Sequence, residues 1–175
     1  MKKFILFTAL LMAAAYLSGC ESEDNTTPSA PHTSPHGALI GHSDCKSSID
    51  INSSDQGKRN KAGAIEDCME YGYEGDTLRL KHINAAFNCC PKEILVETRI
   101  LSDTLIIVES EAASLCDCLC LYDLDIAVYD LPAGKYTIVV KEPYIPEGEP
   151  PLAFDADLTA APAGKYCVKR SRYPW

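Results

Sequence analysis

Three cysteines occupy alternate positions in the stretch SLCDCLCLYD, residues 114–123. Cysteine side chains can bind a metal ion, exchange electrons or form disulfides, and their spacing helps to decide among these roles. In an extended strand, residues two apart lie roughly 6.5–7 Å from each other, whereas the Cβ atoms of a disulfide lie about 4 Å apart. Two thiolates on one zinc ion are at most about 4.6 Å apart, but Cys116 and Cys120 span roughly 13 Å of extended backbone. We therefore expect Cys116, Cys118 and Cys120 each to bond to a partner elsewhere in the chain.

The rest of the chain supplies such partners. The sequence has nine cysteines, and setting Cys20 aside leaves an even number, which favours disulfides in an exported protein. Cys89 and Cys90 are adjacent, so in extended backbone their side chains point to opposite sides. We expect at least one of them to bond to a member of the 116–120 group. The connectivity stays open, and a metal site built on the cysteine cluster is the alternative. The disulfide candidates are Cys45, Cys68, Cys89, Cys90, Cys116, Cys118, Cys120 and Cys167.

An export signal opens the chain. Lys2 and Lys3 precede an apolar run over residues 4–16, which is too short for a spanning helix and is typical of a signal peptide. The run ends in Leu-Ser-Gly-Cys at residues 17–20, which resembles the lipobox of bacterial lipoproteins. That resemblance implies a lipoprotein signal peptide over residues 1–19 and a lipid on Cys20, the first residue of the mature protein. The implied location is the bacterial cell envelope, anchored to the outer membrane at its periplasmic face or at the cell surface.

Residues 20–43 have the composition of a flexible tether, because they are rich in Ser, Thr, Pro, His and Gly. The acidic start at residues 21–24 resembles the signals that send some lipoproteins to the cell surface, with an ordinary solvated linker as the alternative. Residues 44–175 then form one folded domain.

Charge narrows the class of partner. Removing residues 1–19 removes two lysines and no acids, so the 16 basic and 25 acidic residues of the full chain become 14 and 25, a net charge of −11. Such a surface repels phosphate backbones. We therefore expect no nucleic acid partner, and we expect an envelope protein or a glycan besides the membrane that holds the lipid.

The folded part alternates apolar and polar residues with a period of two, which is typical of strands. We expect a hairpin of residues 93–100 and 103–110 around the turn at 101–103, and a second pairing of 121–130 with 134–142. Residues 58–72 could hold a helix. The predicted fold is an all-β, antiparallel, disulfide-stapled sandwich of about seven strands. The predicted strands are 76–83, 93–100, 103–110, 121–130, 134–142, 151–158 and 164–170.

The pentapeptide PAGKY occurs at residues 132–136 and again at 162–166. We expect the proline to fix a turn, the glycine to allow a positive φ, and the tyrosine to begin the returning strand. The longer form LPAGKYTIVV resembles the last hairpin of prealbumin-like and other immunoglobulin-like β-sandwich domains. This resemblance implies a fold and no activity.

Other residues with chemical potential carry weaker signals. His42, Asp44 and Cys45 could form half of a metal site, but a turn held by a disulfide of Cys45 explains them as well. We interpret His82 as a half-buried strand residue. No motif of a known hydrolase, zinc enzyme or nucleotide-binding protein is present, so we expect no catalytic site, metal or cofactor. Six acids could gather around a calcium ion, and these are Glu109, Glu111, Asp117, Asp123, Asp125 and Asp130. A solvated acidic face is the favoured interpretation of them.

The C-terminus combines basic and aromatic residues in an otherwise acidic chain. Lys169, Arg170 and Arg172 lie beside Tyr173 and Trp175, a composition that is common in binding hot spots. We expect this tail to fold back instead, with the arginines opposite the acids of the domain.

As a whole, the chain is similar to cysteine-rich bacterial lipoproteins of unknown function. The sequence therefore predicts a lipid-anchored envelope protein with a binding or structural role and no enzymatic activity. The alternatives are a metal-binding lipoprotein that uses the cysteine cluster and, less favoured, an unrecognised hydrolase.

Overall fold

The computed structural model describes residues 34–46, 65–145 and 147–171. The described residues all belong to one compact unit. The lipobox with Cys20, most of the predicted tether, and Arg172, Tyr173 and Trp175 at the C-terminus lie outside the described residues. The described residues form nine strands and no helix.

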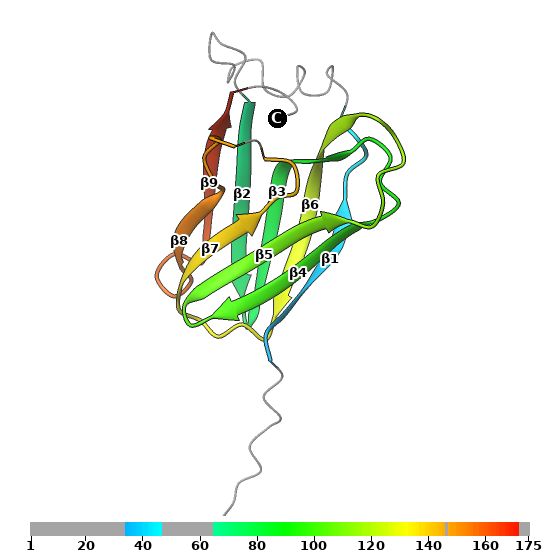
Figure 1. Cartoon of the computed structure of the whole chain (residues 1–175). Coiled ribbons are helices and arrows are strands. Elements are labelled where there is room, and N and C mark those ends of the chain that lie inside the picture. The colour runs from blue at the N-terminus through cyan, green and yellow to red at the C-terminus, as the bar shows by residue number, and fades with distance from the viewer. Residues whose placement is uncertain (1–33, 47–64, 146, 172–175) are drawn as a thin grey trace, which may run out of the picture. The chain divides into compact units, whose positions relative to one another are not determined.

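Two sheets pack face to face, which confirms the predicted all-β sandwich (Figure 1). The five-stranded sheet has the order β1-β6-β3-β2-β9, and the four-stranded sheet has the order β4-β5-β7-β8. All pairings are antiparallel except that of β5 with β7, which is parallel. The strands are β1 (His36–His42), β2 (Ile65–Glu74), β3 (Thr77–Asn88), β4 (Ile94–Leu101), β5 (Thr104–Glu111), β6 (Leu119–Tyr129), β7 (Lys135–Lys141), β8 (Ala153–Asp157) and β9 (Ala163–Arg170).

Two strands lie where the sequence predicted something else. β1 falls inside the predicted tether of residues 20–43, and it pairs with β6 over its whole length. β2 includes residues that were considered for a helix, and it pairs with both β3 and β9. In both segments the composition is poor in β-branched residues, so local propensity was a weak guide. The neighbouring strands provide the hydrogen bonds and the buried face that make these segments extended.

The hairpin of β4 and β5 is confirmed, with Ser102 in the left-handed region at φ 57°. The pairing predicted for residues 121–130 with 134–142 is wrong. β6 pairs with β1 and β3, whereas β7 pairs with β5 and β8, so the chain crosses between the sheets after Asp130. Because the two strands are both buried on one face, alternation alone could not distinguish a hairpin from a crossover.

The core lies between the sheets and is filled by side chains that alternate along the strands. In β6 the inward residues Leu124, Ile126 and Val128 are fully buried. They pack in one hydrophobic cluster with residues such as Leu105 and Ile138 of the opposite sheet. Packed apolar side chains therefore fill the space between the two sheets.

The glycines of the two PAGKY segments do not have a positive φ, so the predicted role for them is wrong. Gly164 instead lies beneath the ring of Tyr71, its register partner in β2, and an added Cβ would lie 2.6 Å from the tyrosine hydroxyl. The ring of Tyr71 in turn stacks on Phe154. The second glycine is thus explained by close packing against an aromatic ring, which only residues without a Cβ permit.

Candidate functional site

All eight cysteines of the folded domain are paired as disulfides. Cys89–Cys118 and Cys90–Cys116 join the end of β3 to the loop before β6. The prediction that at least one of the adjacent cysteines bonds to the 116–120 group is therefore confirmed for both. The remaining pairs are Cys45–Cys120 and Cys68–Cys167.

The 116–120 group is not wholly on an extended strand. Only Cys120 belongs to β6, while Cys116 and Cys118 lie in the preceding loop. Each still finds a separate partner, as the spacing predicted. Because a metal-binding cysteine must be a thiolate, the paired cysteines do not supply the ligands that the alternative of a cysteine metal site requires.

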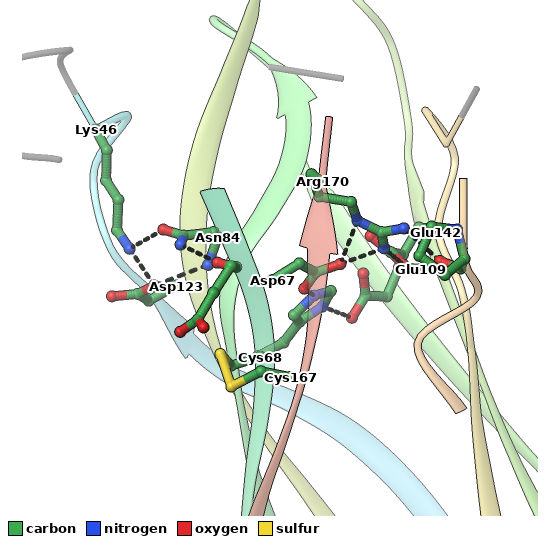
Figure 2. Close-up of polar contacts among 12 residues, drawn as sticks. Lys46, Asp67, Cys68, Asn84, Glu109, Asp123, Glu142, Cys167 and Arg170 are labelled. Carbon is green, nitrogen blue, oxygen red and sulfur yellow. Dashed lines mark hydrogen bonds and ion pairs between the residues drawn. A yellow bond between two sulfur atoms is a disulfide. The ribbon is translucent and has the colours of Figure 1, made fainter. Parts of the chain in front are cut away.

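A cluster of five charged side chains is buried between the two sheets, and we call it the interior charge cluster. Asp67 comes from β2, His82 from β3, Glu109 from β5 and Arg170 from β9, while Glu142 directly follows β7. Four of these side chains have no exposed surface and that of Glu142 is 1% exposed. Figure 2 shows Asp67, Glu109, Glu142 and Arg170 converging from their separate strands.

His82 lies at the centre of this cluster, between two carboxylates. Its Nδ1 is 2.7 Å from Oε1 of Glu109, and its Nε2 is 2.7 Å from Oδ1 of Asp67. Since carboxylates accept hydrogen bonds, the ring donates on both sides and is an imidazolium. His82 is therefore fully buried and ion-paired, not half-buried as the sequence suggested.

Arg170 holds the outer oxygens of two acids. Its Nε donates to Oδ2 of Asp67 at 3.0 Å, and its Nη2 donates to the same oxygen and, at 2.8 Å, to Oε2 of Glu142. Its Nη1 donates to the carbonyl of Pro150. The expectation that the C-terminal arginines lie opposite the domain's acids is thus confirmed for Arg170.

The period of two explains why these charges face inward. Asp67 is two residues before Met69, Glu109 is two after Ile107, and Glu142 is two after Val140, and each of these apolar residues belongs to the core. His82 is likewise two residues after Leu80 and is the register partner of Met69. Arg170 is two residues after the core residue Val168 of β9. Each charge extends an inward-facing apolar row by one position, so all five meet at one end of the sandwich.

Burial and mutual attraction act against each other in this cluster. Burial alone lowers the pKa of His82, but the carboxylates of Glu109 and Asp67 outweigh it and hold that pKa well above the ordinary value. Burial raises the pKa of Asp67, but His82 and Arg170 together bring it below its ordinary value.

Glu142 is the exception among the acids. Burial, followed by the nearby charge of Asp67, raises the pKa of Glu142 to about 8. At neutral pH Glu142 is therefore mostly protonated, which leaves two anions, Asp67 and Glu109, opposite the two cations. The cluster as described is close to electrical neutrality, as expected for charges in a medium of low polarity.

Two oxygens of the cluster have no hydrogen-bond partner within the described part of the chain: Oε2 of Glu109 and Oε1 of Glu142. One donor atom each of Asp67, His82 and Glu142 also lie within 4.8 Å of one another, so these residues could hold a metal ion. The other group with such spacing includes Cys68 and Cys167, which form a disulfide.

The metal half-site considered at His42, Asp44 and Cys45 does not converge. Cys45 is bonded to Cys120, and Nδ1 of His42 is 2.7 Å from the neighbouring carbonyl of Ser43.

None of the six acids that could gather around calcium belongs to a group of converging metal-ligand atoms among the described residues. Glu109 belongs to the interior charge cluster, Glu111 accepts hydrogen bonds from Ser114 and Tyr144, and Asp123 pairs with Lys46.

A second polar group surrounds Lys46, which also donates to Asn84 at 2.9 Å. Asn84 occupies a β-bulge with φ 72° (Figure 2). This second polar group ties the segment after β1 to β3 and β6.

A shallow hollow of about 430 Å³ lies on the outer face of the five-stranded sheet. Both signs of charge line it, with Arg79 and Lys81 from β3, Glu70 from β2 and Asp125 from β6. Ile40 of β1 is also part of the lining and is 48% exposed. The lining of this hollow thus combines polar and apolar groups, as a binding face does.

Sequence reasoning did not single out Asp67 or Glu142. A signal for both was present, because each is a carboxylate at a position where the alternation of β2, or its continuation one residue beyond β7, predicts an inward side chain. A charge at such a position calls for a buried partner.

The chain matches no known protein-family model, no curated protein and no solved structure. Within the described residues there is no helix of the length and apolar character needed to cross a membrane.

Proposed function

We propose that this chain is a lipid-anchored protein of the bacterial cell envelope, held at the outer membrane through Cys20, with a binding or structural role. One observation carries the proposal: eight of the nine cysteines pair with one another. The cysteine left without a cysteine partner is the one in the Leu-Ser-Gly-Cys stretch, where a lipoprotein needs a thiol.

The disulfides also support the compartment. Four bridges persist in an oxidising environment such as the periplasm or the cell surface, and they are rare in the cytosol. They join strands and loops at several places in the sandwich, so the domain is built to remain folded outside the cell's reducing interior.

A surface role follows from the filled core. Since apolar side chains and the interior charge cluster occupy the space between the sheets, recognition falls to the outer faces, loops and edges. The hollow lined by Arg79, Lys81, Glu70 and Asp125 suits a polar partner, such as an envelope protein or a glycan.

Lipidation is tested by replacing Cys20 with serine and labelling cells with a clickable fatty acid. The wild-type chain should be labelled and should fractionate with membranes, whereas Cys20→Ser should lose the label because serine cannot form the thioether. Ser22→Ala, two residues beyond the lipobox, serves as the matched control and should stay labelled. Label that persists on Cys20→Ser would remove the basis of the proposal.

A further inference from the structure

In the interior charge cluster, one oxygen of each of two carboxylates contacts Arg170 and the other oxygen faces away from it. Arg170 occupies Oδ2 of Asp67 and Oε2 of Glu142. The other oxygen of Asp67, Oδ1, lies 2.7 Å from Nε2 of His82, and the other oxygen of Glu142, Oε1, is buried without a hydrogen-bond partner among the described residues. Arg170 therefore orients both carboxylates so that Oε1 of Glu142 remains available for another ligand, while Oδ1 of Asp67 becomes available once Nε2 of His82 has given up its proton.

His82 is oriented as metal-binding histidines usually are. A ligating imidazole almost always donates its second ring N–H to a carboxylate, which fixes the ring and increases its basicity. Glu109 supplies that carboxylate, since its Oε1 is 2.7 Å from Nδ1 of His82. This bond leaves Nε2 facing Asp67.

The distances and the formal charges suit one divalent ion. The donor atoms of Asp67, His82 and Glu142 lie within 4.8 Å of one another, and ligands of a single zinc ion are at most about 4.3 Å apart. Side-chain shifts of less than about 1 Å would bring all three into contact with an ion. Three carboxylates and one guanidinium leave two negative charges when the imidazole is neutral, and a divalent cation cancels them.

We propose that Asp67, His82 and Glu142 bind a divalent first-row transition-metal ion between the two sheets, with Glu109 as the carboxylate that orients His82 and Arg170 as the clamp on the two ligating acids. The ion replaces the proton that Nε2 of His82 donates to Asp67, which is released to solvent, and the two donor atoms move apart from their 2.7 Å separation to bind it. One imidazole and two carboxylates favour Zn²⁺ or Mn²⁺ over Ca²⁺ and Mg²⁺, which prefer sites made of oxygen alone.

The role of this ion is structural. Its ligands come from β2, β3 and the residue after β7, so it links the five-stranded sheet to the four-stranded sheet. The ligand side chains are at most 1% exposed, so the ion enters as the domain folds and is retained afterwards.

The test uses the mature, lipidated chain purified in detergent from cells grown with added Zn²⁺. Metal content is measured after gel filtration in the presence of a chelator. We expect one zinc per chain in the wild type and in Glu97→Gln, a control at a side chain that is 68% exposed. We expect less than about a tenth of that content in Glu142→Gln and His82→Gln, and an affinity about 10 to 100 times weaker in Glu109→Gln.

A folded wild type that holds no zinc after growth with added Zn²⁺ and no manganese after growth with added Mn²⁺ would overturn the proposal. Zinc that Glu142→Gln retains in full would overturn it as well, because the ion would then lie elsewhere, for example on the exposed His36. Should the variants fail to fold, X-ray absorption of the wild-type zinc protein decides. A single imidazole with oxygen ligands supports the proposal, while sulfur ligands or several imidazoles contradict it.

Discussion

Replacing Glu142 with glutamine should make the metal-free domain less sensitive to alkaline pH. The side chain of Glu142 is 1% exposed, and burial raises its pKa from 4.5 to about 8. Glutamine has nearly the shape of the protonated acid and can keep its contact with Arg170, but it cannot ionise. The variant therefore isolates the contribution of one buried proton.

The direction in which the free energy of unfolding changes with pH depends on whether the folded or the unfolded chain holds the proton of Glu142. Between pH 4.5 and about 8 the unfolded chain has lost the proton of Glu142 while the folded domain keeps it. Folding then takes up a proton, so the free energy of unfolding falls as the pH rises through this window. His82 acts in the same direction: its contribution is complete below its ordinary pKa of 6.5 and is lost as the pH rises through its raised folded value. Asp67 acts in the opposite direction, and its contribution is lost as the pH falls through its lowered pKa.

One proton changes the free energy of unfolding by about 1.4 kcal/mol per pH unit. From pH 5 to pH 7, Glu142 alone therefore accounts for a loss of roughly 2–3 kcal/mol in the wild type. In Glu142→Gln this part of the slope should disappear, leaving the part that His82 contributes.

Urea denaturation at several pH values between 5 and 8 measures the effect, on a domain with intact disulfides that has been made metal-free by unfolding and refolding in the presence of a chelator. Glu97→Gln is the control, because its solvated carboxylate should leave the slope unchanged. Parallel curves of stability against pH for the wild type and Glu142→Gln would refute the assignment of a buried proton to Glu142.

Three further outcomes follow from the packing. Gly37→Ala places a Cβ 2.2 Å from Cγ2 of Thr98, so thermal denaturation should show a loss of about 1–3 kcal/mol, relieved in part by Thr98→Ala. Gly41→Ala, whose Cβ would meet nothing closer than 4.0 Å, should have a smaller effect, and equal losses for both glycines would contradict the contact between β1 and β4. Arg170→Met leaves buried acids without their cation and should cost about 3–5 kcal/mol in chemical denaturation, whereas Lys165→Met, at a 40% exposed ion pair of the same strand, should cost under about 1 kcal/mol; similar costs would mean that the burial of Arg170 is unimportant. Reductant should lower the melting temperature measured by circular dichroism, since each disulfide typically contributes about 2–4 kcal/mol, and an unchanged value would show that the bridges do not restrain the fold.

The alternation of apolar and polar residues along the sequence predicts much of the fold. The β4–β5 hairpin, the inward row of Leu124, Ile126 and Val128, and the inward position of His82 follow from the period of two. The cysteine spacing likewise excluded bonds within the 116–120 group and favoured partners near Cys89 and Cys90. These features depend on backbone geometry over a few residues, which sequence patterns record directly.

The tertiary structure decided those features that depend on contacts between segments far apart in the sequence. β1 and β2 are strands because β6, β3 and β9 pair with them, although their composition suggested a tether and a helix. The full disulfide connectivity required knowing which loops meet, and the pair Cys68–Cys167 spans 99 residues. The interior charge cluster depends most on this level of structure: each charge looks like an isolated polar residue in its own strand, and only the packing of two sheets brings the five together. A buried charge is tolerated only beside an opposite charge, so the partner of each residue was decided by the fold as a whole.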